Sequence, residues 1–186
     1  YSSKSKVLIY LVIITNCCLV LLMKKEILHR AINLLSRREH SHKELHQKLL
    51  KKNFGSDDIL SVLDYLRTKD YLSDERFAAS ILRMRVDRGF GWLSIKSELN
   101  SKGVCATIIN ELSKNDEIDW YLQAELAYNK RFSTPLVWCF SFEEAQSSSL
   151  QDKAYQLAIK EKAKRMRFLQ YRGFTSDQII TVLHLG

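Results

Sequence analysis

Proline and glycine are scarce in this chain. Its 186 residues include one proline and six glycines, fewer than a chain of many short strands and tight turns would need. Apolar residues make up 46% of the chain, and along the long segments they recur every three to four positions rather than every second one. The sequence therefore predicts an all-α protein with enough apolar surface for a sizeable core.

The four cysteines do not have the spacing of a metal site or a disulfide framework. Cys17 and Cys18 are adjacent, Cys105 and Cys139 stand alone, and no pair forms a Cys-x-x-Cys motif. Zinc sites and disulfide-rich domains both need such paired spacings. We therefore expect a reducing compartment, the cytoplasm, and no bound metal.

No catalytic constellation is evident. His42 and His46 share a helical face, but Glu44 does not follow His42 directly as the base of a zinc protease would, and no third ligand is apparent. With His40 nearby, an adventitious zinc or nickel site is the alternative to exposed histidines on a basic helix.

The paired carboxylates have a simpler explanation than catalysis. Each pair lies at or near a predicted helix start, where the helix dipole favours negative charge; the pairs are Asp57/Asp58, Asp74/Glu75 and Asp116/Glu117. The sequence thus predicts a protein that is not an enzyme and has no cofactor and no small-molecule substrate.

One apolar run, Val7–Leu22, precedes the amphipathic part of the chain. As a helix it would span about 24 Å, short of the roughly 30 Å hydrocarbon core of a membrane. It lacks a small-x-small cleavage site, and Met23 is followed at once by two lysines and an amphipathic pattern. We expect residues 1–22 to lie outside the fold and Met23 to be the start; a membrane anchor is the alternative.

The net charge of +8 favours a polyanionic partner, such as nucleic acid or an acidic protein surface. A solvated basic surface without a partner is the alternative. The densest basic run comprises Lys160, Lys162, Lys164, Arg165 and Arg167. The central stretch, 71–103, reads as a helix, a break at Gly89 and Gly91, and a second helix. This stretch combines an apolar side with a cationic side, which indicates a binding surface.

One turn pattern occurs three times. Asn53, Gly103 and Gly173 each follow a basic residue and precede an apolar one, as at a helix end closed by a residue in the left-handed region. Apolar residues recur at fixed distances from these turns, namely Leu49, Leu99 and Leu169 before them, and Ile59, Ile109, Ile179, Val62, Leu112 and Val182 after them.

This repetition predicts three tandem three-helix modules, 23–70, 71–117 and 118–186, that stack into an elongated, curved rod. The third module contains an inserted loop at about 133–150, which includes the segment Leu136–Ser149.

Helix starts and faces follow from the same patterns. We expect Ser41, in a capping box with Glu44, and also Ser56 and Ser73 to cap helices. The predicted core-facing residues are Phe77, Ile81 and Met84 in one helix, Leu122, Leu126 and Tyr128 in another, and Tyr155, Ile159, Ala163 and Met166 in a long helix over 150–171.

Two signatures resemble the RecX family of bacterial recombinase regulators. The first is Asp74-Glu75-Arg76-Phe77-Ala78, then Arg83-x-Arg85-x-x-Arg88-Gly89-Phe90-Gly91, then Ile95-x-x-x-Leu99-x-x-Lys102-Gly103. The second is Lys162-Ala163-Lys164-x-x-Arg167-Phe168-Leu169-x-x-Arg172-Gly173-Phe174. The likeness runs from about Met23 to Leu185, and the family is similar in having three three-helix modules.

The resemblance implies a monomeric regulatory protein that lies in the groove of the filament formed by RecA on single-stranded DNA. Such a protein opposes filament growth, ATP turnover, strand exchange and the co-protease role of the filament in the SOS response, and so modulates DNA repair. The alternative is a direct single-stranded DNA binder without a recombinase target. The candidate contact residues are Arg76, Arg83, Arg85, Arg88, Lys96, Lys102, Arg165, Arg167 and Arg172.

Three features depart from the family pattern. These are the apolar run before Met23, Trp92 at a position where many members have proline, and the length of the Leu136–Ser149 insertion. None of them falls on the repeated core positions, but the insertion bears on how the third module is arranged.

Overall fold

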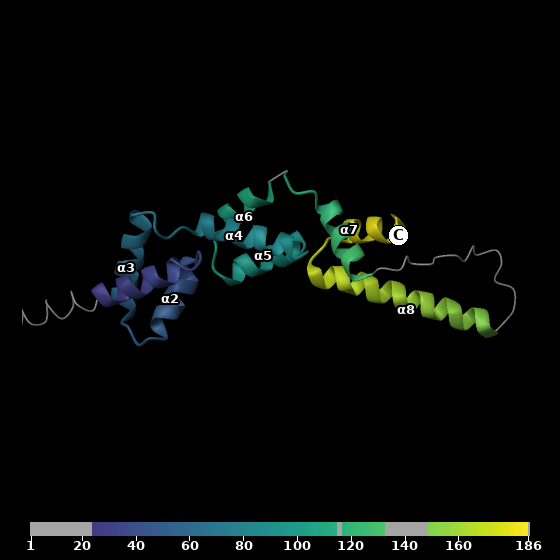
Figure 1. Cartoon of the computed structure of the whole chain (residues 1–186), viewed down its shortest axis with the longest axis horizontal. Helices are drawn as coiled ribbons and strands as arrows, with labels where there is room; N and C mark the ends of the chain where they lie inside the picture. The colour runs from purple at the N-terminus through teal and green to yellow at the C-terminus, as the bar shows by residue number, and fades with distance from the viewer. Residues whose placement is uncertain (1–23, 115–116, 133–148, 186) are drawn as a thin grey trace, which may run out of the picture. The chain divides into compact units, whose positions relative to one another are not determined.

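The computed structural model describes residues 24–114, 117–132 and 149–185 (Figure 1). These residues form helices joined by turns and loops and contain no strand, which confirms the all-α prediction. A helix over 24–35 comes first. It is followed by α2 (His42–Leu50), α3 (Ser56–Thr68), α4 (Asp74–Asp87), α5 (Trp92–Ser101), α6 (Ala106–Ser113), α7 (Trp120–Arg131), α8 (Ser149–Arg172) and α9 (Ser176–Leu185).

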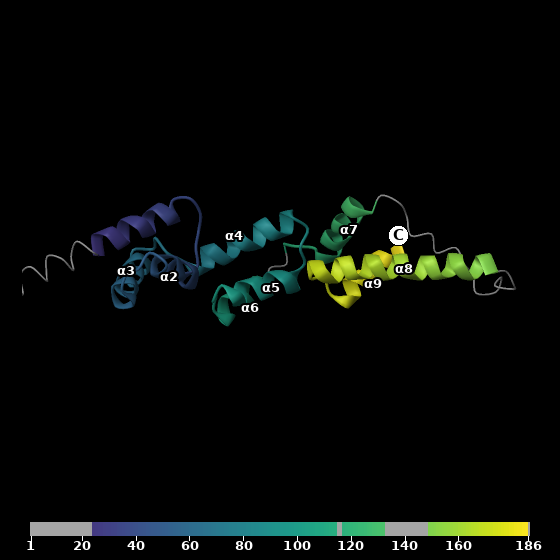
Figure 2. The same ribbon diagram turned by 90° about the horizontal axis from the view of Figure 1, so that it is seen from below.

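The chain divides into two compact units. The first unit comprises the described residues up to Ala78 together with Lys102–Ile108, and the second comprises Ala79–Ser101 and the described residues from Ile109 onward. The helices follow one another in three sets of three, but the middle set contributes to both units (Figures 1 and 2).

Two of the three predicted serine caps are present. The Ser41 hydroxyl accepts a hydrogen bond from the Glu44 amide at 3.1 Å, and the Ser73 hydroxyl accepts one from the Arg76 amide at 3.1 Å. The prediction for Ser56 was wrong, because Gly55 holds the N-cap position of α3 and Ser56 is already helical. The carboxylates of Asp57 and Asp58 lie in the first turn of α3, where they offset the exposed amide dipoles.

The three repeated turns have the predicted backbone geometry. Asn53, Gly103 and Gly173 have φ values of 62°, 78° and 86°. The apolar residue after each turn is buried, and so are eight of the nine repeated core positions, while Leu112 is half-buried. The buried anchors after the turns are Phe54, Val104 and Phe174.

Each unit has an apolar core of its own. In the first unit the helix over 24–35 packs Ile27 and Ala31 against residues of α2 and α3, among them Leu45 and Leu63. In the second unit α7, α8 and α9 surround a core that includes Tyr128, Leu169, Phe174 and Ile179. Complete burial of such side chains stabilises a fold by about 1.5–3 kcal/mol each.

The predicted face of α7 was correct only for Tyr128. Leu122 and Leu126 are exposed, whereas Ala124, Ala127 and Tyr128 are buried. Small side chains on this face let α7 approach α9 closely, so the larger leucines are left on the outside.

Two other predicted faces were correct only in part. In α4 Phe77 is buried but Ile81 and Met84 are half-buried, and Leu82 takes the interior position. In α8 Tyr155 and Ile159 are exposed, while Ala163 and Met166 are half-buried. The predicted insertion, Leu136–Ser149, lies almost wholly outside the described residues, as does the run Val7–Leu22. Within the described ranges, no helix is long and apolar enough to cross a membrane.

Two glycine turns meet inside the second unit. The amide of Gly91 donates to the carbonyl of Arg172 at 2.8 Å, and the amide of Leu93 donates to the carbonyl of Gly173 at 3.0 Å. A Cβ atom on Gly91 would overlap the Gly173 carbonyl, and one on Gly173 would overlap the Ser94 backbone. This contact therefore requires glycine on both sides.

Replacement of Gly173 by alanine tests that requirement. We expect Gly173→Ala to lower the free energy of unfolding by about 2 kcal/mol or more, because it combines a positive φ with a backbone clash. Gly55→Ala is the control, since a Cβ there meets only a side-chain oxygen at 3.7 Å. Chemical denaturation measures both, and equal small losses would show that the two turns are not in close contact.

Candidate interaction surface

Four of the nine candidate cationic residues are exposed and unengaged. Arg83, Arg88, Lys96 and Arg167 belong to the second unit and are exposed. Within the described part of the chain their side chains form no hydrogen bond or ion pair. These four residues, which we call the free cations, are available to a partner at little desolvation cost.

Arg76 is held by acidic neighbours in the first unit. Its Nε donates to Glu39 at 3.1 Å, and Nη1 donates to the Asp70 carboxylate at 2.7 Å. Nη2 also donates to the Asp70 carbonyl at 2.7 Å. The hydrogen bond to Asp70 is the main factor that raises the pKa of Arg76. This side chain therefore joins the α3–α4 connection to the segment before α2.

Two further candidates enclose one aromatic ring. The guanidinium carbons of Arg85 and Arg172 lie 4.8 and 4.7 Å from the Phe90 ring centroid. Arg85 also donates to Glu98 at 2.6 Å, and Arg172 donates to the carbonyl of Arg88 at 2.5 Å. Cation–π contacts of this kind contribute about 0.5–2 kcal/mol each. Phe90 is consequently in contact with two guanidinium groups of its own unit.

Arg165 is part of the interior of the second unit. Its side chain is 5% exposed, its Nη1 donates to the Tyr128 hydroxyl at 2.6 Å, and its Nε donates to Glu161 at 3.2 Å. The guanidinium also lies 5.0 Å from the Phe132 ring centroid. Arg165 therefore secures α8 against α7, and this burial keeps it off the surface where the sequence had placed it.

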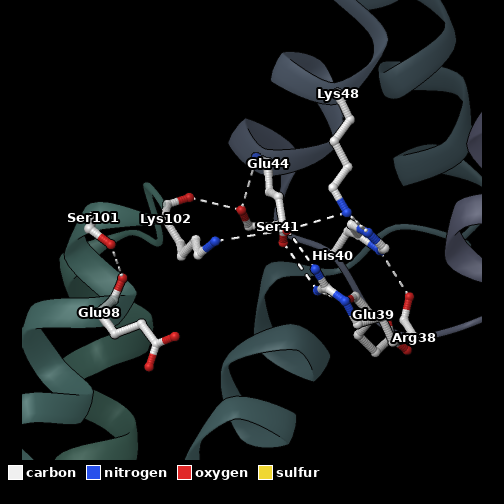
Figure 3. A network of polar contacts seen from close by, with 9 residues as sticks. All are labelled: Arg38, Glu39, His40, Ser41, Glu44, Lys48, Glu98, Ser101 and Lys102. Atoms are coloured by element: carbon white, nitrogen blue, oxygen red, sulfur yellow. Dashed lines mark hydrogen bonds and ion pairs between the residues drawn. The ribbon is translucent and has the colours of Figure 1, made fainter. Parts of the chain in front are cut away.

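The strongest charge cluster of the first unit surrounds Glu44 (Figure 3). Arg38 binds both carboxylate oxygens, at 2.5 and 3.1 Å. Lys48 and Lys102 approach the same carboxylate at 3.5 and 3.8 Å. Ser41 adds a hydrogen bond from its hydroxyl to the Lys102 carbonyl at 2.8 Å. The cluster thus joins α2 to the segment that follows α5, and it uses Lys102 internally.

The electrostatics of Glu44 follow from these contacts. Burial acts to raise the pKa of Glu44, but the hydrogen bond and charge of Arg38, with Lys102 and Lys48, outweigh it and lower the pKa from 4.5 to about 2. His40 adjoins the cluster: its Nδ1 donates to the Arg38 carbonyl at 3.0 Å, and its Nε2 accepts from Lys48 at 2.8 Å. Burial lowers the pKa of His40, in keeping with a neutral ring.

Sequence reasoning missed two cations in the second unit. Lys130 and Arg131, in the last turn of α7, line a depression of about 390 Å³ together with Arg88, Arg172 and the single carboxylate of Asp87. Basic residues in a last helical turn are common because they offset the helix dipole, so their position along the chain does not distinguish these two from other helix ends.

The described residues do not assemble a metal site. No group of three or more histidine, cysteine, aspartate or glutamate residues among them could hold a metal ion. His40 lies within the Glu44 cluster, and the backbone amide of His42 donates to the Asp74 carboxylate at 2.8 Å. Asp116 lies outside the described residues. Three sets of three helices define an all-α helical-repeat protein.

Three family models match the chain in consecutive segments. They describe the first, second and third three-helix domains of RecX and match residues 28–66, 73–112 and 152–183. A protein named regulatory protein RecX from Vibrio parahaemolyticus is 38% identical over 149 residues, covering 80% of this chain and 84% of the relative. A protein of the same name from Haemophilus influenzae is 34% identical over 153 residues, covering 82% and 89%. The chain belongs to the RecX family.

A solved structure shows the same fold. The crystal structure of RecX from Lactobacillus salivarius superposes with a TM-score of 0.63 at 21% identity, covering 88% of this chain and 98% of that one. The three-helix sets predicted from the repeated turns are thus the family architecture.

The Glu44 cluster makes the stability of the fold depend on pH. A folded-state pKa below the unfolded value stabilises the fold above pH 4.5, and this contribution is lost as the pH falls from 4.5 toward 2. It amounts to about 3 kcal/mol. We expect Glu44→Gln to lose most of it at neutral pH and to flatten the pH dependence in that range.

Glu26→Gln is the matched control, because Glu26 forms an exposed ion pair with Arg30 and should change stability by less than about 1 kcal/mol. Urea denaturation from pH 2 to 7 measures all three proteins. Parallel curves for wild type and Glu44→Gln would contradict the proposed role of the cluster.

Arg165 and Arg167 form a matched pair on α8. Arg165→Ala removes the partner of the buried Tyr128 hydroxyl and the guanidinium packed beside Phe132, and should cost about 2–4 kcal/mol. Arg167→Ala removes an exposed side chain and should cost less than about 0.5 kcal/mol. Thermal and chemical denaturation compare them, and similar losses would mean that Arg165 is not buried.

Proposed function

We propose that this chain is a regulatory protein that binds the RecA filament on single-stranded DNA within the filament groove. There it opposes recombinase activity, ATP turnover and the co-protease role in the SOS response. Membership of the RecX family carries this proposal, together with relatives named regulatory protein RecX. The protein acts as a monomer in the cytoplasm, by binding rather than by catalysis.

The free cations provide the contact chemistry of the proposal. They are spread over α4, α5, α8 and the turn after α4 of the second unit, so they can meet several acidic groups of a large partner. Exposed charges of this kind mainly accelerate association and set specificity, because they steer the encounter and reject unsuitable surfaces. Arg83, Arg88 and Lys96 come from the module 71–117, and Arg167 comes from the module 118–186.

The other five candidate cations support the surface rather than form it. Arg85 and Arg172 hold Phe90, and Arg76, Lys102 and Arg165 have acidic or aromatic partners within their own unit. Each partner would have to be released before the side chain could bind elsewhere. Arg85, Arg165 and Arg172 act as positioning residues that keep the helices of the second unit, and so the free cations, in place, whereas Arg76 and Lys102 stabilise the first unit.

Charge reversal of two free cations tests the proposal. We expect Arg83→Glu with Arg88→Glu to raise the protein concentration needed for half-inhibition of RecA ATPase on single-stranded DNA about tenfold, since two attractions become repulsions. The effect should weaken as the ionic strength rises.

Lys114→Glu with Lys160→Glu is the control, because it reverses two exposed charges of the same unit outside the candidate set. Circular dichroism and thermal melting verify that both double variants are folded. Normal inhibition by the folded Arg83/Arg88 variant would overturn the assignment of these residues, and absence of inhibition by the unaltered protein would overturn the function.

A further inference from the structure

A second cationic region lies in the first unit and includes none of the candidate residues. It is a groove of about 600 Å³ between the helix over 24–35 and α2. Five cationic side chains line it, and no carboxylate does; they are Arg30, Arg37, Lys48, Lys51 and Lys52. We call this region the α2 groove.

Three of these cations carry charge that the unit does not balance. Arg30 is paired with Glu26 at 2.8 Å, and Lys48 lies 3.5 Å from Glu44. Arg37, Lys51 and Lys52 are exposed, and their side chains form no ion pair or hydrogen bond among the residues that the structure describes. The excess positive charge of the α2 groove therefore rests on these last three.

Helix dipoles explain part of this arrangement but not all of it. Arg37 follows the helix over 24–35, and Lys51 and Lys52 follow α2, where cations offset the partial negative charge of a helix end. One basic residue at each end would serve that purpose. The dipoles do not account for five cations that converge on one groove without an acidic residue, and such a site repels cations and attracts a polyanion.

We infer that the α2 groove binds the sugar–phosphate backbone of single-stranded DNA. Lysine, arginine and asparagine are the side chains that commonly contact phosphates, and Asn33 lies in the groove beside the cations. Its remaining lining is aliphatic, Leu34 and Leu49. Because no aromatic ring lines it, bases cannot stack there, and binding should be independent of base sequence.

This contact is separate from the proposed recombinase surface. The free cations belong to the second unit, whereas every residue of the α2 groove belongs to the first. The acidic start of α3, with Asp57 and Asp58 in its first turn, disfavours a different DNA contact through that helix end. DNA binding by this chain can therefore be measured in the absence of the recombinase. A negative result for DNA binding leaves the proposed recombinase contact open, and the reverse also holds.

The test measures binding of the whole chain to a labelled oligothymidylate by fluorescence anisotropy over a range of salt concentrations. The test variant combines Arg37→Gln, Lys51→Gln and Lys52→Gln. Each phosphate contact on a single strand contributes about −0.7 to the slope of log K against log salt, so the slope should become shallower by about 2. Affinity at low salt should fall about tenfold or more.

The matched control combines Lys25→Gln, Arg67→Gln and Lys69→Gln. These exposed residues belong to the same unit and lie outside the α2 groove. Their replacement removes the same amount of positive charge as the test variant does. Equal losses in both triple variants would show that binding follows net charge alone and would overturn the inference. Thermal melting shows whether each variant is folded. If the triple test variant does not fold, the single variant Lys51→Gln takes its place, with an expected slope change of about 0.7.

Two further arms separate the sources of negative charge. Inorganic tripolyphosphate that binds the α2 groove while oligothymidylate does not would overturn the DNA assignment in favour of a free phosphate ligand. A test variant that binds oligothymidylate normally but loses affinity for the RecA filament would overturn it in favour of an acidic protein surface. A preference for one base composition would contradict backbone recognition.

Discussion

At three points along the chain a helix ends in a residue with a positive φ, and the apolar residue after it is buried. Asn53, Gly103 and Gly173 occupy these positions. The left-handed residue reverses the chain direction within a single turn, and the buried anchor fixes the angle at which the next helix leaves. Because the core positions on both sides are counted from this turn, the packing of each helix set depends on it.

The arginines fall into two groups, one that stabilises helix packing and one that is exposed on the surface. Those with acidic or aromatic partners, such as Arg165 over Phe132 and Arg85 on Glu98, stabilise helix packing. Those without such partners among the residues that the structure describes, such as Arg83 and Arg167, are exposed to solvent. A guanidinium can serve either purpose because it is planar, weakly hydrated and permanently charged. Positive net charge alone therefore overstates how much of the surface is available for binding.

The sequence predicted what depends on neighbours along one helix and missed what depends on distant segments. The turn at Asn53 and the cap at Ser41 follow from local rules. The burial of Arg165 depends on Tyr128, which lies 37 positions away, and nothing in the α8 pattern distinguishes it from Arg167. On α7 two small alanines pack inward beside Tyr128, whereas the larger Leu122 and Leu126 are exposed, so the prediction was correct for Tyr128 alone. Family resemblance named the class but could not separate engaged arginines from free ones.

The contact between Gly91 and Gly173 has a consequence for the order of events during synthesis. The first amides of α5 have no partners within that helix, and two of them donate to carbonyls of Arg172 and Gly173. A nascent chain leaves the ribosome with its amino end first. The hydrogen bonds at the start of α5 can therefore form only after some eighty further residues have been synthesised. Until then these two backbone amides can bond only to water.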